Sequence, residues 1–383
     1  MSVTTPQGFL ASGVAAGIKE GKPDLAVVVN PGPEFSAAAV FTSNRFQAAP
    51  VRWSQQAVKN GQLQAVVLNS GGANACTGEA GYADAIATAA ALAKQLEIDT
   101  EDVAVCSTGL IGVRLPMDAV FAGIEFAVAG LSSAGGADAA TAIMTTDTVP
   151  KTAEYVDQAG WSIGGMAKGA GMLAPALATM LVCVTTDASV PPAVLDRALR
   201  AAVSLTFDRA DSDGCMSTND TVLALANGAS GISVDEEEFT TRLAQVCWSL
   251  ARQLIADAEG AEHDIEVRVT GAASEADALE VARAIARSNL FKCAVFGNDP
   301  NWGRVLSAAG TCQAEFDPEH VDVLFNSVEV FRDGQLGEDR AKVDLGNREV
   351  LVEVRLHAGE ASASIWTNDL TYGYVKENAE YST

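Results

Sequence analysis

The chain has 383 residues, of which 48% are hydrophobic and 19% charged, with 34 glycines and 12 prolines along its length. This composition predicts a globular chain that is too long for one compact core, so we expect two to three lobes. Lysines and arginines number 25 against 49 aspartates and glutamates, and the net charge of −24 would repel nucleic-acid phosphates and anionic lipids. Nucleic acids and membranes are therefore excluded as expected partners.

Cysteine usage and the first residues favour a reducing, cytoplasmic location. Seven cysteines are present, an odd number without a C-x-x-C pair, which fits neither a disulfide framework nor a zinc ribbon. We expect them to be small buried hydrophobic residues. The start MSVTTPQGFL has neither region of a signal peptide, and the most apolar stretch, 172–184, is shorter than the about 20 residues that cross a bilayer.

Short β-branched runs alternate with alanine-rich helical patterns. In chain order they predict strands at 25–29, 37–42 and 63–68, a helix at 79–96, a strand at 103–106 running into a Ser107-Thr108-Gly109 turn, and a helix at 117–129. Beyond Thr179 follow a strand at 180–185, helices at 191–204 and 236–258, a strand at 265–270, a helix at 274–288, strands at 321–325 and 350–356, and a helix at 372–381. The chain is predicted to be mixed α/β or α+β, without internal repeats.

Two helices carry more specific expectations. The large residues of 79–96, namely Tyr82, Ile86, Leu92 and Leu96, recur at near-helical spacing and predict one face packed on a sheet. At the extreme C-terminus disorder is the usual expectation, but Tyr372, Val375 and Tyr381 could anchor the last helix.

A glycine-rich segment from Lys168 to Leu181 is the most informative stretch. Gly169, Gly171 and Ala174 fit the dinucleotide pattern G-x-G-x-x-A, but Pro175 falls inside the helix that this pattern needs. The alternative is a tight loop before a strand that begins at Thr179. A threonine there can act as a nucleophile once its own amino group, with a pKa near ~8, is freed to serve as the base.

Histidine-based catalysis is not favoured by the pattern. His263, His320 and His357 are widely separated and show neither H-E-x-x-H nor serine-triad spacing, so each is interpreted as a surface or packing residue. A nucleophile that does not depend on histidine becomes more attractive, and no metal site is expected.

The whole chain resembles the ornithine acetyltransferases, the bifunctional glutamate N-acetyltransferases of arginine biosynthesis. The resemblance rests on K-G-A-G-M-L-A-P-A-L-A-T-M-L from Lys168, C-S-T-G-L-I-G from Cys106, I-M-T-T-D-T from Ile143, D-G-C-M-S-T-N-D-T from Asp213, A-D-A-E-G from Ala256, D-P-N-W-G-R from Asp299 and Y-V-K-E-N-A-E-Y-S-T from Tyr374. It implies a DmpA-like layered sandwich of sheets covered by helices.

The resemblance also implies self-cleavage between Ala178 and Thr179 into an α chain, 1–178, and a β chain, 179–383. Thr179 would be the nucleophile, and Thr108 with Gly109 would form the oxyanion hole. Taken alone, this pair is more typical of a plain turn after a strand. The family pattern places substrate contacts at Thr145, Lys168, Thr179, Glu259, Asn378 and Thr383, although Glu259 alone would read as a solvated carboxylate.

The expected reaction moves acetyl from N-acetylornithine to glutamate without a cofactor, in an α2β2 assembly of cleaved chains. Acetyl-CoA is a second donor that the resemblance leaves open. An N-terminal-nucleophile aminopeptidase or amidase would use the same threonine but pass the acyl group to water. A metabolite-binding protein that has lost catalysis is the alternative of another class.

Overall fold

A computed structural model describes residues 2–172 and 180–380. The chain forms two compact units. Unit 1 comprises Met1–Asp208 and Cys215–Asp257, and unit 2 comprises Arg209–Gly214 and Ala258–Ser382. Unit 1 therefore contains residues from both sides of the expected cleavage site.

The first sheet of unit 1 has the strand order β1-β2-β4-β5 among the described residues. The first three strands pair antiparallel, and β4 and β5 run parallel. All five residues of β2, LAVVV, are buried, as expected for a strand covered on both faces. The strands are β1 (Leu10–Val14), β2 (Leu25–Val29), β4 (Ala65–Gly72) and β5 (Val103–Leu110).

The second sheet has the order β3-β9-β8-β7-β6 in the described part of the chain. Strands β9 and β8 are parallel, whereas the other neighbours are antiparallel. The strands are β3 (Ser36–Phe41), β6 (Lys151–Val156), β7 (Ser162–Lys168), β8 (Leu181–Thr186) and β9 (Thr221–Ala226).

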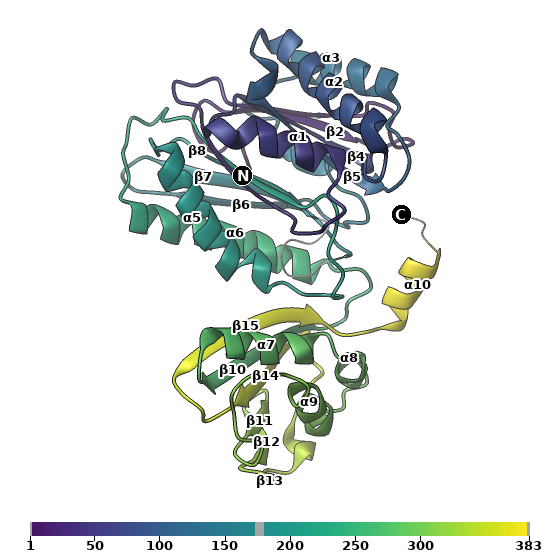
Figure 1. Ribbon diagram of the computed structural model, residues 1–383, viewed down its shortest axis with the longest axis vertical. Helices are drawn as coiled ribbons and strands as arrows, with labels where there is room; N and C mark the ends of the chain where they lie inside the picture. Colours follow the sequence, from purple (N-terminus) through teal and green to yellow (C-terminus); the bar gives the residue numbers. More distant parts are fainter. Residues whose placement is uncertain (1, 173–179, 381–383) are drawn as a thin grey trace. The chain divides into compact units, whose positions relative to one another are not determined.

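Unit 1 is a four-layer sandwich in which the two sheets pack face to face between helices (Figure 1). Alternate residues of β8 show this directly, since Leu181 and Cys183 join the core shared with the first sheet, whereas Val182 and Val184 join the core under α5 and α6. The expected sandwich of sheets covered by helices is confirmed. The helices of unit 1 are α1 (Ala49–Ala57), α2 (Gly78–Leu96), α3 (Met117–Ala129), α4 (Gly136–Ala142), α5 (Pro192–Leu205) and α6 (Glu236–Ala256).

Helix α2 packs on the core through three of the four large residues that we expected, since Leu92 is buried and Tyr82 and Leu96 are half-buried against the core, and through small residues beside them. Ile86 is exposed, whereas Ala85, Ala89, Leu92 and Ala93 are buried. These residues follow helical spacing, and alanine side chains let the helix lie close to its neighbours.

Unit 2 contains a sheet of order β13-β12-β11-β14-β10-β15 among its described residues. Buried and half-buried residues alternate along β10 and β14, so one face meets the core. The strands are β10 (Asp264–Ala272), β11 (Asp322–Phe325), β12 (Val328–Arg332), β13 (Gln335–Leu336), β14 (Glu349–Arg355) and β15 (Ala361–Asn368). The helices are α7 (Glu275–Ala286), α8 (Asn289–Phe296), α9 (Trp302–Ala309) and α10 (Tyr372–Glu380), and short 3₁₀ turns lie at Val58–Asn60, Thr100–Asp102, Phe207–Arg209 and Arg340–Lys342 along the chain.

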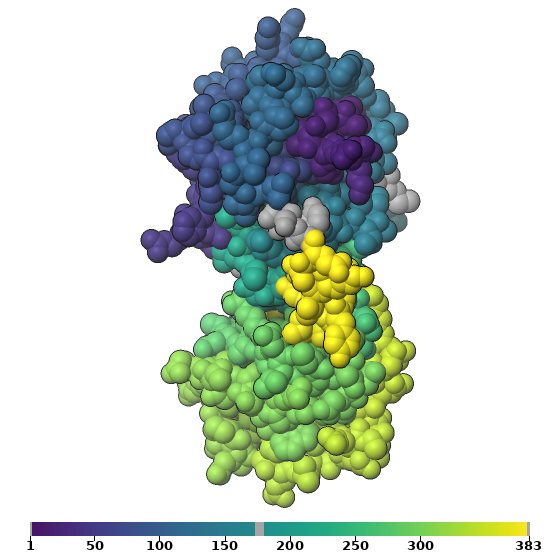
Figure 2. Space-filling view, turned by 90° about the vertical axis from the view of Figure 1, so that its right-hand side faces the viewer, coloured from purple at the N-terminus to yellow at the C-terminus, as the bar shows by residue number. Residues whose placement is uncertain are grey.

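Helix α10 forms where a helix was predicted, and of its expected anchors Tyr372 makes an edge-to-face contact with Phe296, with 5.4 Å between ring centres. Tyr372 is 83% exposed and Val375 57% exposed, and the helix, yellow in Figure 2, stands on the surface. Polar contacts also fix its first turn: the Thr371 hydroxyl donates to Gly260 O at 2.6 Å and accepts from Tyr374 N at 3.0 Å. Tyr381 lies outside the described residues.

Two further expectations can be compared with the structure. No helix of the described residues is long and apolar enough to span a bilayer. The cysteines are free but only partly buried, so their interpretation as buried hydrophobic residues is wrong for several of them: Cys106, Cys183 and Cys247 are buried, Cys312 is half-buried, and Cys76, Cys215 and Cys293 are exposed.

Candidate active site

The segment expected to carry the nucleophile joins two neighbouring strands of unit 1. Ala178 and Thr179 lie outside the described residues, but both flanks are described. Strand β7 ends at Lys168, β8 begins at Leu181, and these two residues are partners in an antiparallel register. The dinucleotide-binding interpretation is wrong, because that motif belongs to a parallel β-α-β unit and the two strands here are antiparallel.

A buried aspartate fixes the residue that follows Thr179. The backbone N–H of Met180 donates to Oδ1 of Asp220 at 3.0 Å. Asp220 is fully buried, and its Oδ2 has no hydrogen-bond partner among the described residues. Burial raises the pKa of this carboxyl well above its usual value, against the opposing effects of Met180, Ser217 and Lys168. The surroundings of Asp220 therefore favour its neutral form.

Thr108 and Gly109 lie within β5, so the predicted turn at this point is wrong. Gly109 has φ +126°, and a Cβ at this position would come within 2.5 Å of the backbone carbon of Gly71 on β4. The register of the two strands shifts next to this pair. The close approach of β4 and the positive φ both require glycine, which explains why Gly follows Thr108.

The start of β9 is tied to this strand by an amide side chain. Nδ2 of Asn219 donates to Ser107 O at 2.9 Å and to Ala73 O at 2.6 Å. Asn219 and its neighbour Asp220 are both buried. The residue that holds Met180 is therefore adjacent to one that holds the backbone beside Thr108.

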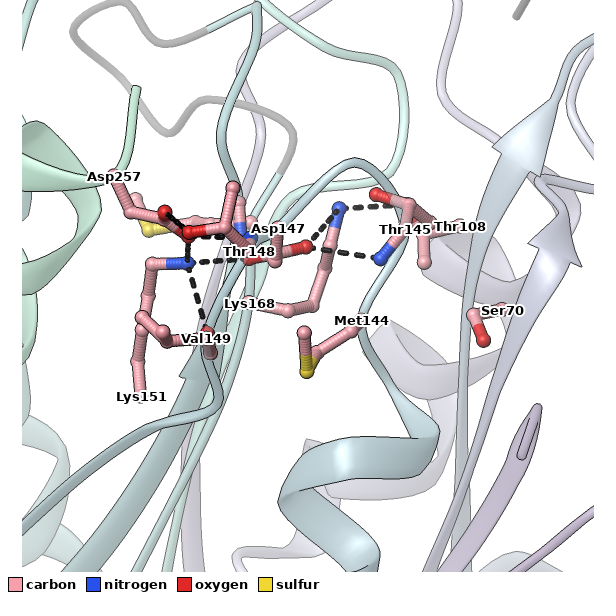
Figure 3. A network of polar contacts seen from close by, with 12 residues as sticks. Ser70, Thr108, Met144, Thr145, Asp147, Thr148, Val149, Lys151, Lys168 and Asp257 are labelled. Carbon is pink, nitrogen blue, oxygen red and sulfur yellow. Dashed lines mark hydrogen bonds and ion pairs between the residues drawn. The ribbon is translucent and has the colours of Figure 1, made fainter. Parts of the chain in front are cut away.

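Lys168 connects Thr108 to a buried carboxylate (Figure 3). Its Nζ donates to Thr108 Oγ1 at 3.4 Å and lies 4.0 Å from Oδ2 of Asp147. The same Oδ2 accepts from the backbone N–H of Thr145 at 2.9 Å, and Oδ1 accepts from Gly169 N at 2.6 Å. Thus Thr108, Thr145 and Lys168, three of the expected residues, lie together in unit 1.

A second lysine neutralises the other side of Asp147. Lys151, fully buried at the start of β6, lies 2.6 Å from Asp147 Oδ1 and 2.5 Å from Asp257 Oδ2. Thr148 donates to the carboxylate of Asp257 from both its amide and its hydroxyl. These contacts fasten the turn that carries Thr145 to the C-terminal end of α6.

The charge state of Asp147 follows from these neighbours. Burial alone would raise its pKa, but the charges of Lys168 and Lys151 and the hydrogen bonds from Lys151 and Thr145 outweigh burial and lower the pKa to about 2. Asp147 is therefore ionised at neutral pH. A buried ion network of this kind holds Lys168 in a defined position before any ligand arrives.

The expected residues of unit 2 form a separate polar contact. Nδ2 of Asn378 donates to Oε2 of Glu259 at 3.0 Å and to Tyr374 O at 3.0 Å. Asn378 is exposed and Glu259 half-buried. Thr383 lies outside the described residues.

All three histidines belong to unit 2. His263 is buried and bonded to Asp369 and to Leu345 O, so it is a packing residue as predicted. His320 and His357 contact aspartates at the surface. In residues 2–172 and 180–380, no group of three or more His, Cys, Asp or Glu side chains could hold a metal ion.

The sequence interpretation missed the buried charges that organise the site. Asp147 and Asp220 both lie in motif blocks that carry the family resemblance, and Lys151 begins a strand whose apolar residues alternate with polar ones. A signal was therefore present, namely charged residues next to strands of a densely apolar sheet. Their burial and pairing appear only in the folded chain.

Known proteins of one family match this chain over nearly its whole length. The ArgJ family model matches residues 10–383. Proteins named arginine biosynthesis bifunctional protein ArgJ, from Streptomyces avermitilis and Thermobifida fusca, are 62% and 60% identical over 384 residues, covering 100% of each chain. The solved structure of an ornithine acetyltransferase complexed with ornithine, from Mycobacterium tuberculosis, is 57% identical with a TM-score of 0.45, covering 45% of this chain and 94% of that one. With full-length identity at this level, the chain belongs to the ArgJ family.

Proposed function

We propose that this chain transfers acetyl from N-acetylornithine to glutamate through an acetyl ester on Thr179. The chain is a bifunctional acetyltransferase of arginine biosynthesis, with ornithine acetyltransferase and N-acetylglutamate-forming activities, as its family membership establishes. The steps and residues below explain how its fold would perform this chemistry.

Maturation starts with attack of the Thr179 hydroxyl on the carbonyl carbon of Ala178. The new C–O bond replaces the C–N bond, and the released nitrogen takes the hydroxyl proton and becomes the free amine of Thr179. Water then hydrolyses the ester, which restores the hydroxyl and leaves a carboxylate on Ala178. The products are chains 1–178 and 179–383.

Turnover uses the same hydroxyl with the new amine as its base. The amine, with an ordinary pKa of ~7.7–8.0, accepts the hydroxyl proton while the oxygen attacks the acetyl carbonyl of N-acetylornithine. The tetrahedral intermediate collapses, the amine returns the proton to the leaving nitrogen, and ornithine departs. The amino group of glutamate then attacks the acetyl ester, giving N-acetylglutamate and free Thr179.

The contact between Lys168 and Thr108 is the observation that carries the proposal. Because Lys168 donates to Thr108 Oγ1, the hydroxyl hydrogen of Thr108 remains available to donate to a developing oxyanion. The Gly109 amide would be the second donor. One such donor is worth about 10²–10³ in rate, so a fixed orientation of this hydroxyl has a large kinetic consequence.

Substrate contacts are proposed for the remaining family positions. In unit 1, Lys168 is almost fully buried, and both Lys168 and the Thr145 backbone are held by the carboxylate of Asp147. This fixed pair suits binding of the carboxylate of an amino-acid substrate. In unit 2, Glu259 would contact an amine, with Asn378 holding the carboxylate of Glu259 in position. Thr383 is proposed as a further contact on the basis of the family pattern alone.

Purified protein tests the proposal by mass and by N-terminal sequencing. We expect two chains, the second beginning Thr-Met-Leu-Val. Double-reciprocal plots of the initial rate against N-acetylornithine, at several fixed glutamate concentrations, should give parallel lines, because ornithine leaves before glutamate binds. Thr179→Ala should remain a single chain of 39.6 kDa, whereas Thr179→Ser should still cleave. A single uncleaved chain in active material would contradict the proposal.

Product analysis separates the transferase from an amidase. With saturating glutamate, N-acetylglutamate should form faster than acetate; the reverse would identify a hydrolase. The same assay with acetyl-CoA tests the second donor. The cleaved chains are further proposed to assemble as α2β2, which native mass spectrometry measures.

A further inference from the structure

Lys19 lies on a rigid loop between β1 and β2 of unit 1. Four consecutive backbone amides, those of residues 16–19, donate to the carboxylate of Asp24 at 2.6, 3.1, 2.6 and 2.8 Å. Asp24 is fully buried, and its own carbonyl accepts from Ser70 N at 2.8 Å. The loop is therefore fixed to the end of β4 by its backbone, and the Lys19 side chain starts from a defined position.

The stem of Lys19 lies against Gly71 of β4, the strand that pairs with the strand carrying the oxyanion pair. A Cβ placed on Gly71 would come within 2.6 Å of Lys19 Cγ. Gly71 is the parallel partner of Gly109. The absence of a side chain at Gly71 thus lets the lysine lie against the strand next to Gly109.

The ammonium group of Lys19 ends beside the turn that carries Thr145. Its Nζ donates to Met144 O at 2.7 Å. An ammonium has three N–H donors, and in the described part of the chain this carbonyl is the one acceptor recorded for them. Partial burial lowers the pKa of Lys19, and the charges of Lys168 and Asp147 act on it as well, so it belongs to the same electrostatic site.

We propose that Lys19 binds the α-carboxylate shared by both amino-acid substrates. In N-acetylornithine, the acetylated nitrogen and the carboxylate are attached to the same carbon, so a carboxylate-binding group must lie close to the oxyanion hole. Lys168, the carboxylate contact proposed above, is also engaged by Thr108 and Asp147, so Lys19 would supply a second cation for the same carboxylate, with donors beyond the one that binds Met144 O. The inference rests on the proposed acetyl-Thr179 mechanism.

This role would also explain how one site accepts two different side chains. Ornithine carries a cationic side chain and glutamate an anionic one, and the two share only the α-amino and α-carboxylate groups. A lysine dedicated to the shared carboxylate serves both half-reactions. The competing role is purely structural, in which Lys19 only donates a hydrogen bond to the Met144 carbonyl.

Kinetics with an acid and its amide distinguish the two roles. Wild type, Lys19→Met and Lys19→Gln are compared with N2-acetylornithine and with N2-acetylornithine carboxamide, which lacks the negative charge. Lys19→Met should raise KM for the acid by about 10- to 100-fold, as for loss of a charged hydrogen bond, and change kcat by less than about threefold. For the amide, wild type and variant should agree within about threefold.

Controls separate this inference from the proposed function. Lys22→Met removes an exposed lysine of the same loop and should leave both KM values unchanged. Lys19→Gln keeps a donor for Met144 O. Its KM for the acid should therefore rise toward that for the amide if the charge of Lys19 binds substrate, and both KM values should stay as in wild type if Lys19 only supports the Met144 carbonyl. The same variant replaces Lys19→Met should that variant fail to cleave. An acid preference that survives in the variants, or equal losses for acid and amide, would overturn the role of Lys19. Absence of acetyl transfer in wild type would instead overturn the function.

Discussion

Asp147 and Asp220 hold the two ends of the segment that contains Thr179, and their surroundings shift their pKa values in opposite directions. Asp147 accepts from Gly169 N, directly after β7, and Asp220 accepts from Met180 N, directly before β8. Asp147 lies between Lys151 and Lys168, and its pKa is lowered to about 2. Asp220 has one unpartnered oxygen among the described residues, and its pKa is raised well above the usual value.

The difference shows that burial by itself does not decide the charge of a carboxyl group. Both side chains are removed from water, which disfavours ionisation. Only Asp147 has two lysines close enough to reverse that effect. The start of the segment is thus fixed by a charged network, whereas its end is fixed by a carboxyl whose surroundings favour the neutral form.

Asp147→Asn is expected to change the free energy of unfolding more than any other substitution considered for this comparison. The substitution leaves Lys151 and Lys168 without the charge that balances them, so the free energy of unfolding should fall by about 3–5 kcal/mol at neutral pH. Because the folded pKa lies below the unfolded value of ~3.9, this stabilisation is present above about pH 4 and is lost as the pH falls toward 2. Urea denaturation between pH 2 and pH 7 measures both effects.

The measurement is made in the Thr179→Ala background, so that unfolding does not separate two cleaved chains. Asp118→Asn, at an exposed position in the first turn of α3, is the matched control and should change stability by less than about 0.5 kcal/mol. If Asp147→Asn were as mild as this control, the charged network would not be what holds the start of the segment.

Asp220→Asn should give a smaller effect with the opposite pH dependence. A raised folded pKa means that wild type keeps the contribution of this group below about pH 4 and loses it as the pH rises through the folded pKa. The asparagine variant does not titrate, so its stability relative to wild type should improve with rising pH from an initial difference within about 1 kcal/mol. A relative stability that falls as the pH rises would show that Asp220 is ionised in the folded protein.

The regular elements were predictable where local composition was decisive. The helix predicted at 117–129 coincides with α3, and the strand predicted at 25–29 coincides with β2. Strand β7, SIGGMAK, was missed because its two glycines hide its β pattern, although both lie buried in the sheet. The Ser107-Thr108-Gly109 turn was wrong because the partner that keeps this backbone in a strand, Gly71, lies far away in sequence.

Site residues divide in the same way. Thr108, Thr145 and Lys168 were reached through a family resemblance, and the structure brings them together, whereas the placement of Thr179 lies outside the described residues. Asp147 and Asp220 were not singled out, because a buried aspartate differs from a surface one only through its neighbours in the fold.

The smallest expected effect belongs to the contact between the exposed Asn378 and the half-buried Glu259, which provides the solvent-accessible reference for the two buried aspartates. Asn378→Ala removes a 3.0 Å hydrogen bond to the Glu259 carboxylate, but water can replace the lost donor. Its free energy of unfolding should therefore change by less than about 0.5 kcal/mol, no more than for Lys376→Ala on the same exposed helix. KM for N-acetylornithine should nevertheless rise for Asn378→Ala and not for Lys376→Ala, because only Asn378 positions the proposed amine-binding carboxylate. A loss of 2 kcal/mol or more would mean that this contact stabilises unit 2 itself, and the contrast between the buried aspartates and the half-buried Glu259 would then not depend on solvent access.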